Sequence, residues 1–358
     1  MKTNRTTLLF KRNKKYVLGN IVLLIVPFLF LTIGCEEEQK EEDSIISFVK
    51  TYGGLDNEFG YSVCQSTDSG YIITGTKHIT GTIWSNILLI KTDLNGNEEW
   101  TKIFDFSNFE HAHSVQQTYD DGYIIVGSIH NPSNAILIKT DADGNGEWVK
   151  TFGGSENDNA LSVQQTTDSG YIITGSTKSF GNGVADVWLI KTDANGDSLW
   201  TKTFGGSDND NAFSVQQTTD SGYIITGNTK SFGDGTNYIW LIKTDSNGNE
   251  IWNQTISSIN YETGYSAQLT EDGGLIILGE TVSLQWDIDV LLIKTDIKGI
   301  EEWRQTFNRT RNDQVRSVQQ TTDGGYIITG RTISFEDNNS DLLLIKTDNE
   351  GDVVIQAD

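Results

Sequence analysis

Two segments in the middle of the chain, DSGYIITG at 168–175 and WLIKTD at 188–193, decide the fold. The last five letters, LIKTD, occur six times, and successive copies start 48, 52, 52, 51 and 52 residues apart. A fixed period of about 50 residues is typical of repeat architectures, in which each copy is one supersecondary unit. The copies lie at 89–93, 137–141, 189–193, 241–245, 292–296 and 344–348.

Each copy contains four short apolar segments separated by turn signals. In the copy at 160–204, DSG at 168–170 and DANG at 193–196 mark reversals, because Gly, Asn and Asp tolerate the positive φ values of tight hairpins. The segment at 187–191 is apolar at successive positions, which indicates that both faces of the strand are covered. Stacked blades provide such cover, so we predict an all-β fold, a single six-bladed β-propeller of four-stranded antiparallel blades over 45–358.

The pair of segments is similar to the repeat of a broad set of uncharacterised β-propeller proteins of bacteria and archaea. In those repeats a DGGYIIxG strand pair, present here at 323–330, is followed by WLIKTD. The resemblance covers roughly residues 46–358 and implies the propeller fold. It implies little about function, because propellers host lectins, hydrolases, dehydrogenases and scaffolds.

Both ends of the repeat region match the outermost strand of a blade. FVKTYGG at 48–54 corresponds to WVKTFGG at 148–154, and VVI at 353–355 corresponds to the same strand again. We predict that the strand around Phe48–Tyr52 completes the sixth blade, because an open blade edge leaves backbone groups unpaired. Which of the two ends closes the ring stays open.

The N-terminus has the layout of a secretory signal over residues 1–34. Six Lys or Arg residues precede or begin an apolar run from Tyr16 to Ile33, which ends at Gly34-Cys35. This segment resembles a bacterial lipoprotein signal, which implies cleavage before Cys35, lipid attachment to Cys35 and a lipid anchor in the membrane. Thr32 departs from the aliphatic residue usual in that motif. An uncleaved signal-anchor in the inner membrane is the alternative, because about 18 apolar residues can span a bilayer.

An acidic tether follows at 35–44 and cannot bury enough apolar surface to fold. It resembles the acidic export signals of surface lipoproteins of Bacteroidetes, which implies a place in the cell envelope, at the outer membrane or cell surface. A plain solvated spacer is the alternative. The whole chain carries a net charge of −23, so a nucleic acid is not expected as a partner.

Metal and cofactor motifs are weak. DADGNGE at 141–147 has the oxygen-rich spacing of a calcium loop, but it runs directly into a strand, and we interpret it as a hairpin turn. His111 and His113 lie on one side of a strand without a third histidine at a supporting spacing. We therefore expect no metal and no cofactor, with calcium as the alternative. Cys64 stands where the other copies have Gln, and we interpret it as a drifted repeat position.

Comparison of the copies indicates a binding surface at the end of the blades opposite the short Asp-Gly turns. One position near the start of the innermost strand holds five different residue types in the six copies, whereas the next residue is always Ser. Unlike side chains around a channel mouth can form an asymmetric pocket, and neutral drift is the alternative. Seven Trp residues fill repeat positions of the core, but two lie in the variable loop before the third strand. The predicted ligand-binding residues are Tyr61, His113, Phe213, Tyr265 and Arg316, with Trp84 and Trp286 above them.

The functional hypothesis is a non-catalytic binding or scaffold module, anchored in the membrane, for glycan or protein ligands. The alternative is an extracytoplasmic glycan-active hydrolase. Carboxyl groups with raised pKa values at the channel mouth would favour the hydrolase. With 49 Asp and Glu residues, no catalytic residue can be singled out from the sequence.

Overall fold

The computed structural model describes residues 50–353 except 55, 107–108, 131–132, 257–260, 283–287, 308–310 and 334–339, and it does not describe the side chains of 311–313, 331–333 and 340–342. The predicted signal, Cys35, the tether and Trp286 lie outside these residues. Residues Ile46–Asp358 form one compact unit. Within the described part of the chain, no helix is long and apolar enough to cross a membrane.

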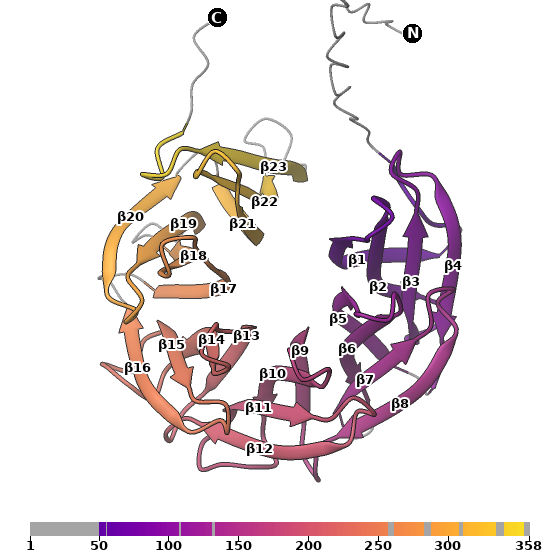
Figure 1. The fold of residues 1–358 in the computed structure, drawn as a ribbon, viewed down its shortest axis with the longest axis horizontal. Helices are drawn as coiled ribbons and strands as arrows, with labels where there is room; N and C mark the ends of the chain where they lie inside the picture. The colour runs from indigo at the N-terminus through magenta and orange to yellow at the C-terminus, as the bar shows by residue number, and fades with distance from the viewer. Residues whose placement is uncertain are drawn as a thin grey trace, which may run out of the picture. The chain divides into compact units, whose positions relative to one another are not determined.

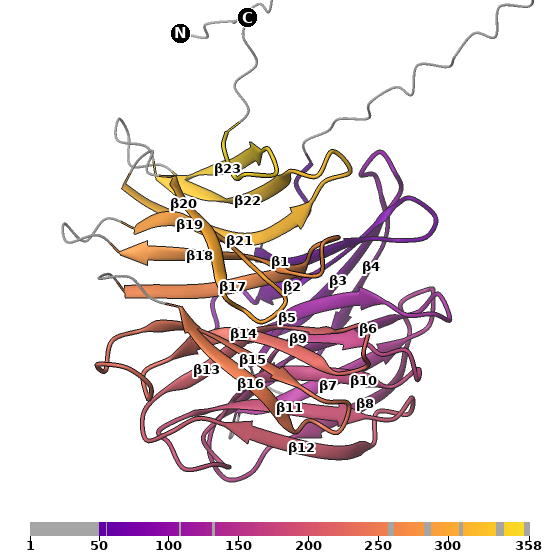
Figure 2. The same ribbon diagram turned by 60° about the vertical axis from the view of Figure 1, so that its left-hand side comes forward.

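The prediction of an all-β propeller with six antiparallel blades is confirmed (Figures 1 and 2). The innermost strands are β1 (Asn57–Gln65), β5 (Glu110–Gln117), β9 (Asp158–Gln165), β13 (Asp210–Gln217), β17 (Tyr261–Leu269) and β21 (Arg311–Gln320). The second strands are β2 (Tyr71–His78), β6 (Tyr123–Ile129), β10 (Tyr171–Thr177), β14 (Tyr223–Thr229), β18 (Leu275–Val282) and β22 (Tyr326–Ile333). The third strands are β3 (Ser85–Thr92), β7 (Asn134–Thr140), β11 (Asp186–Thr192), β15 (Tyr238–Thr244), β19 (Ile288–Thr295) and β23 (Ser340–Thr347). The outermost strands are β4 (Glu98–Phe104), β8 (Gly146–Phe152), β12 (Ser198–Phe204), β16 (Glu250–Ile256) and β20 (Glu301–Phe307).

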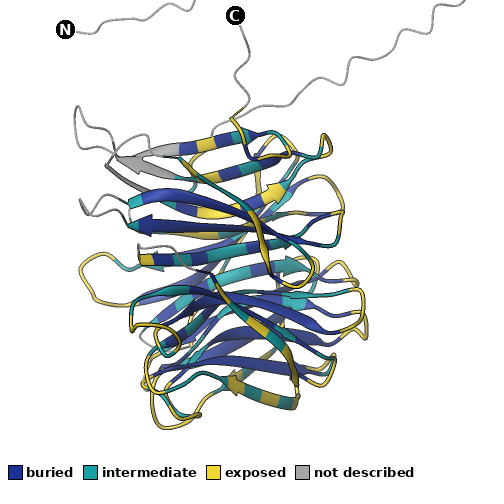
Figure 3. Ribbon diagram, turned by 90° about the vertical axis from the view of Figure 1, so that its left-hand side faces the viewer, coloured by how far each residue is buried: buried dark blue, intermediate teal, exposed yellow. Residues whose placement is uncertain are grey.

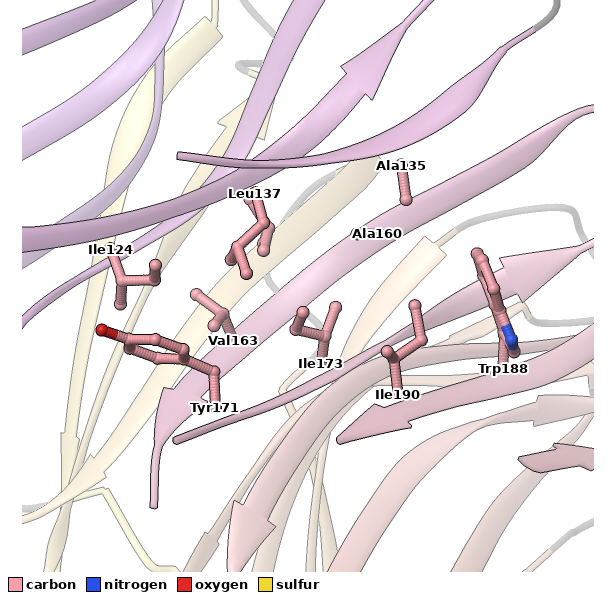
Figure 4. Packing of buried hydrophobic residues seen from close by; sticks show 10 residues of the cluster. Ile124, Ala135, Leu137, Ala160, Val163, Tyr171, Ile173, Trp188 and Ile190 are labelled. Atoms are coloured by element: carbon pink, nitrogen blue, oxygen red, sulfur yellow. The ribbon is translucent and has the colours of Figure 1, made fainter. Parts of the chain in front are cut away.

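The hydrophobic core lies between successive blades. Figure 4 shows Ile124 and Leu137 of the second blade facing Val163, Tyr171 and Ile173 of the third. Full burial of one such aliphatic side chain contributes roughly 1.5–3 kcal/mol, so each interface holds two blades together. The second and third strands are accordingly buried along most of their length (Figure 3).

The short turns at one end of each blade are held by the Lys of LIKTD, which is buried in four blades and half-buried in the fourth and sixth. In the third blade, Lys191 Nζ donates to Asp168 Oδ1 at 3.0 Å and to the carbonyl of Thr192 at 2.8 Å. A Cβ on Gly170 would lie 2.2 Å from that carbonyl, so only glycine fits there. The same ion pair recurs in all six blades, between Lys91, Lys139, Lys191, Lys243, Lys294 or Lys346 and Asp68, Asp120, Asp168, Asp220, Asp272 or Asp323 respectively.

Glutamines join neighbouring blades at this turn end. The backbone N–H of Gln165 donates to Gln116 Oε1 at 2.7 Å, and that of Gln320 donates to Gln268 Oε1 at 2.6 Å. Cys64 holds the corresponding position in the first blade, where burial raises the pKa of its thiol. A buried thiol with a raised pKa is a poor nucleophile, in keeping with a drifted repeat position.

The described residues leave the propeller open between the sixth and first blades (Figure 1). Val63 and Leu344 are 62% and 56% exposed, whereas their counterparts Val163 and Leu189 are 6% and 0% exposed. Phe48 lies outside the described residues. Tyr52 donates to the carbonyl of Gly96 in the first blade, and Val353 bridges to Thr347 as the first pair of an outermost strand in the sixth.

Candidate functional site

Every innermost strand contains a β-bulge, and the bulged residue is the one that differs from blade to blade. In the third blade, Ala160 pairs with Gly175 and Ser162 pairs with Thr174, which leaves Leu161 unpaired. A bulge redirects a side chain relative to the regular alternation of a strand. The bulged residues are Tyr61, His113, Leu161, Phe213, Tyr265 and Arg316.

The bulge requires glycine at the last position of YIITG, because the bulged strand comes too close there for a Cβ. A Cβ on Gly175 would lie 2.0 Å from the carbonyl oxygen of Asn159, and Gly127 and Gly227 face a carbonyl at 1.9 Å in the same way. An isolated glycine inside a strand is a known sign of a bulge, so this signal was present in the sequence. The bulge also places these residues in the middle of the strand and not near its start, as the sequence had suggested.

Two pairs of the predicted residues come together. The rings of Tyr61 and His113 have centroids 6.0 Å apart, and those of Phe213 and Tyr265 have centroids 5.3 Å apart. Leu161 of the third blade stands between the two pairs in chain order. The variable residues therefore form two aromatic groups, one on the first two blades and one on the fourth and fifth.

The second group has a polar border. Tyr265 Oη donates to Glu280 Oε2 at 3.2 Å, and Glu280 Oε1 accepts from the backbone N–H of Val315 at 3.2 Å. Burial, together with the charge of Glu280, raises the pKa of Tyr265 to about 12, although the nearby Arg316 acts in the opposite direction. Arg316 is exposed, and its guanidinium donates to the carbonyl of Val315 at 3.2 Å. Tyr265 is therefore both one ring of the aromatic pair and a neutral phenol, and Arg316 is a cation near it.

Trp84 is exposed, but the structure does not place it on either group. The backbone carbonyl of Trp84 accepts from the backbone N–H of Ile79 at 3.0 Å. The backbone N–H of Trp84 donates to Thr82 Oγ1. Among the described residues, no ring contact links Trp84 to Tyr61 or His113. Trp286 lies outside the described residues, so its predicted role stays a prediction.

The structure gathers all four histidines of the chain on the first two blades. The ring of His111 lies 6.0 Å from His78, 6.4 Å from His113 and 6.1 Å from His130, centroid to centroid. Phe109 contacts both His111 and His130. His78 and His130 were not predicted as site residues, although they occupy one repeat position in neighbouring blades. Alignment of the copies with one another would have revealed them.

Burial is the main cause of the unusual protonation of this group. It lowers the pKa of His113 to about 4. Burial, reinforced by the charges of His130 and His78, also lowers the pKa of His111. These two imidazoles are therefore neutral at pH 7.

One acidic position at this loop end is structural. Asp158 is fully buried, and its carboxylate accepts from the backbone N–H of Gly154 at 2.8 Å and from Ser179 Oγ at 2.6 Å. Asp210 binds Gly206 and Ser231 in the same way. These carboxylates fix the conformation of the links between blades. The backbone of the loop end is therefore more tightly held than its sequence variation suggests.

The calcium-like run has its oxygens engaged within the turn. Asp141 Oδ1 accepts from the backbone N–H of Asn145 at 2.7 Å, and Asp141 Oδ2 accepts from the Asn145 side chain at 3.0 Å. Within the described ranges, no group of three or more His, Cys, Asp or Glu side chains could hold a metal ion.

The hollows of the described surface do not coincide with the bulged residues. One of about 490 Å³ lies at the turn end, where Tyr119, Asp120 and Gln165 line it, and one of about 230 Å³ lies beside Tyr52, Glu58 and Leu88 on the exposed face of the first blade. The first is bordered by Lys139 and Asp120, the ion pair that holds the turn in the second blade. We therefore assign it to the structural turn and not to a site.

Comparisons with known proteins support the fold. No protein-family model and no curated protein matches the sequence. Among solved structures, the chain is similar to a protein of unknown function from Bacteroides caccae, with 13% identity, a TM-score of 0.46, and coverage of 78% of this chain and 92% of that chain. It is also similar to a puromycin hydrolase, with 11% identity, a TM-score of 0.52, and coverage of 84% of this chain and 47% of that chain. At 11% identity, the likeness to the puromycin hydrolase shows a shared fold and nothing further.

Proposed function

We propose that this protein is a non-catalytic binding module, held at the cell envelope by a lipid on Cys35, that takes glycan or protein ligands at the inner strands of its propeller. One observation carries the proposal: the bulge presents five different residue types in the six blades, whereas the Asp-Gly turns repeat in every blade. Aromatic rings supply apolar contact area for a ligand, and a cation and a neutral phenol beside them fix the orientation of the ligand.

Eleven aspartates of the propeller do not have the pKa that a glycan hydrolase needs in its acid. A glycan hydrolase needs an acid whose pKa is raised toward neutrality. Eleven aspartates of the described chain have a pKa that is lowered and not raised, namely Asp56, Asp68, Asp93, Asp120, Asp141, Asp168, Asp220, Asp234, Asp245, Asp272 and Asp323.

A glycan array probed with the purified protein, followed by product analysis of every glycan retained, separates the two functions. We expect retention of at least one glycan class without cleavage. A glycan released as shortened products would overturn the non-catalytic function. If no glycan is retained, the same protein is used to capture cell-surface proteins, and failure of both screens would contradict the proposal.

The anchor is tested independently. Replacing Cys35 with Ser should abolish labelling by a fatty-acid probe and release the protein from the membrane fraction. Equal labelling of wild type and variant would remove the lipid anchor from the proposal and favour the uncleaved signal-anchor.

A further inference from the structure

The loop between the second and third strands is built in the same way in the third and fourth blades. It begins with KSFG at 178–181 and again at 230–233. Ser179 Oγ donates to the buried carboxylate of Asp158 at 2.6 Å, and the fourth blade repeats this hydrogen bond at the same distance. The backbone of the loop is therefore fixed by the same contact in two neighbouring blades.

The lysine and the phenylalanine of each loop reach the solvent. Lys178 and Lys230 are exposed, and within the described residues neither forms an ion pair, although the whole chain has a net charge of −23. Phe180 and Phe232 are 46% and 40% exposed. Each ring packs on a buried tryptophan of its own blade, with centroids 5.6 Å and 5.1 Å apart. Each loop therefore presents an ammonium group to solvent and, two residues later, an aromatic ring that is held in place.

Two hydrogen bonds join the two loops through the link between their blades. The backbone N–H of Val184, in the loop of the third blade, donates to the carbonyl of Asp208 at 3.3 Å. The backbone N–H of Asp208 in turn donates to Ser231 Oγ, in the loop of the fourth blade, at 3.0 Å. Val184 is itself 54% exposed. The two Lys-Ser-Phe segments therefore lie on one continuous strip of surface at the loop end.

The lysine is not a requirement of the fold. The position of Lys178 and Lys230 holds His in the first and second blades, Val in the fifth and Ile in the sixth. Those blades form with the same pairing of their first and second strands. A cation shared by two adjacent blades, each beside a supported ring, therefore calls for an explanation outside the fold.

From this arrangement we propose that the two Lys-Ser-Phe segments are adjacent subsites for an acidic polysaccharide, a glycan whose sugar units carry carboxylate or sulfate groups. An ammonium group binds such an anion as a point charge, and an aromatic ring offers apolar area to the face of a sugar. Two equal subsites suit a ligand that repeats along its length, because the second contact is intramolecular once the first has formed. This site is separate from the inner-strand site of the proposed function and shares with it only the class of ligand.

The test first compares polymers with and without charge. Polygalacturonate, its fully methyl-esterified form and dextran sulfate are each titrated into the full chain in a calorimeter. We expect at least one of the two acidic polymers to bind at least about tenfold more tightly than the ester. Binding of polygalacturonate alone would identify the anion as carboxylate, and binding of dextran sulfate alone would identify it as sulfate. Binding of neither acidic polymer, or equal binding of the ester, overturns the proposal.

The site is then tested with two double variants of equal charge. Lys178→Gln with Lys230→Gln should weaken binding of the acidic polymer at least about tenfold, because both cations of the site are lost. Lys150→Gln with Lys202→Gln is the control, since it removes the same charge from outermost strands, and it should leave the affinity unchanged. Full affinity in the first variant, or equal losses in the two variants, overturns the proposal.

Failure of this inference can be told apart from failure of the proposed function. A neutral glycan that the glycan array retains should bind the Lys178→Gln, Lys230→Gln protein as tightly as it binds the wild type, because no charge of the ligand is involved. A retained neutral glycan together with no bound acidic polymer would overturn the acidic site and leave the proposed function standing.

Discussion

The two ends of each blade use the same strands for different purposes. At the turn end, a lysine, an aspartate and a glycine recur in all six blades and make the same contacts, and the lysine is buried in four of them. Toward the loop end, the position opened by the bulge holds Tyr, His, Leu, Phe, Tyr and Arg in turn. Residues that hold the turn backbone in place recur in every copy, whereas the residue at the bulge is free to differ.

The largest effect should come from filling the turn end. Gly170→Ala forces a Cβ to 2.2 Å from the Thr192 carbonyl, so we expect a loss of about 2–4 kcal/mol in the free energy of unfolding. Gly54→Ala is the control, because a Cβ there meets nothing within 4 Å and should change stability by less than about 0.5 kcal/mol. Denaturant unfolding measures the loss of stability in both variants. Equal losses would show that the close contact at Gly170 does not restrict this position to glycine.

A smaller loss should follow removal of the lysine. Lys191→Met leaves the Thr192 carbonyl and Asp168 without their buried partner, which should cost about 1–3 kcal/mol. Lys202→Met in the same blade removes only a surface hydrogen bond to Asn249 and should cost less than about 0.5 kcal/mol. If the two variants unfold at the same denaturant concentration, the buried lysine does not hold the turn.

The two ends should also lose stability in different pH ranges. The pKa of His113 is lowered to about 4, so the unfolded chain binds its proton first, and stability falls as pH drops from about 6.5 toward 4. Hydrogen bonds from Lys91 and Ser66 lower the pKa of Asp68 to about 2, so its stabilisation is lost from about pH 4 downward. His113→Leu, which copies Leu161, should flatten the upper range alone in pH-dependent unfolding. If the variant loses stability between pH 6.5 and 4 as the wild type does, burial of His113 is not the cause of that loss.

Much of the fold follows from local signals. The LIKTD period and the Asp-Gly turns predict blade number, strand order and the core Trp residues, because each copy repeats the same physical requirement. Trp188 and Trp240 are indeed buried. The open face at Val63 and the sheltered acid at Asp158 could not be predicted, since they depend on how blades meet.

The candidate site was only partly predictable. The differing position was visible in the sequence, but the bulge that redirects it depends on a close approach between Gly175 and Asn159 across two strands. The approach of His78 to His111 joins residues from different blades, so only the three-dimensional arrangement revealed it. The sequence signals that were available are the glycine inside each second strand, which indicates the bulge, and the shared repeat position of His78 and His130.

The most direct test of the account measures the affinity of one screened ligand for two matched double variants. Phe213→Ala with Tyr265→Ala removes an aromatic pair whose centroids are 5.3 Å apart, and Thr167→Ala with Thr219→Ala changes exposed side chains at the turn end. We predict that the first variant binds at least about tenfold more weakly, a loss of about 1.4 kcal/mol, while the second binds like the wild type. Full affinity in the first variant together with lost affinity in a folded second variant would place the ligand at the turn end and contradict the account.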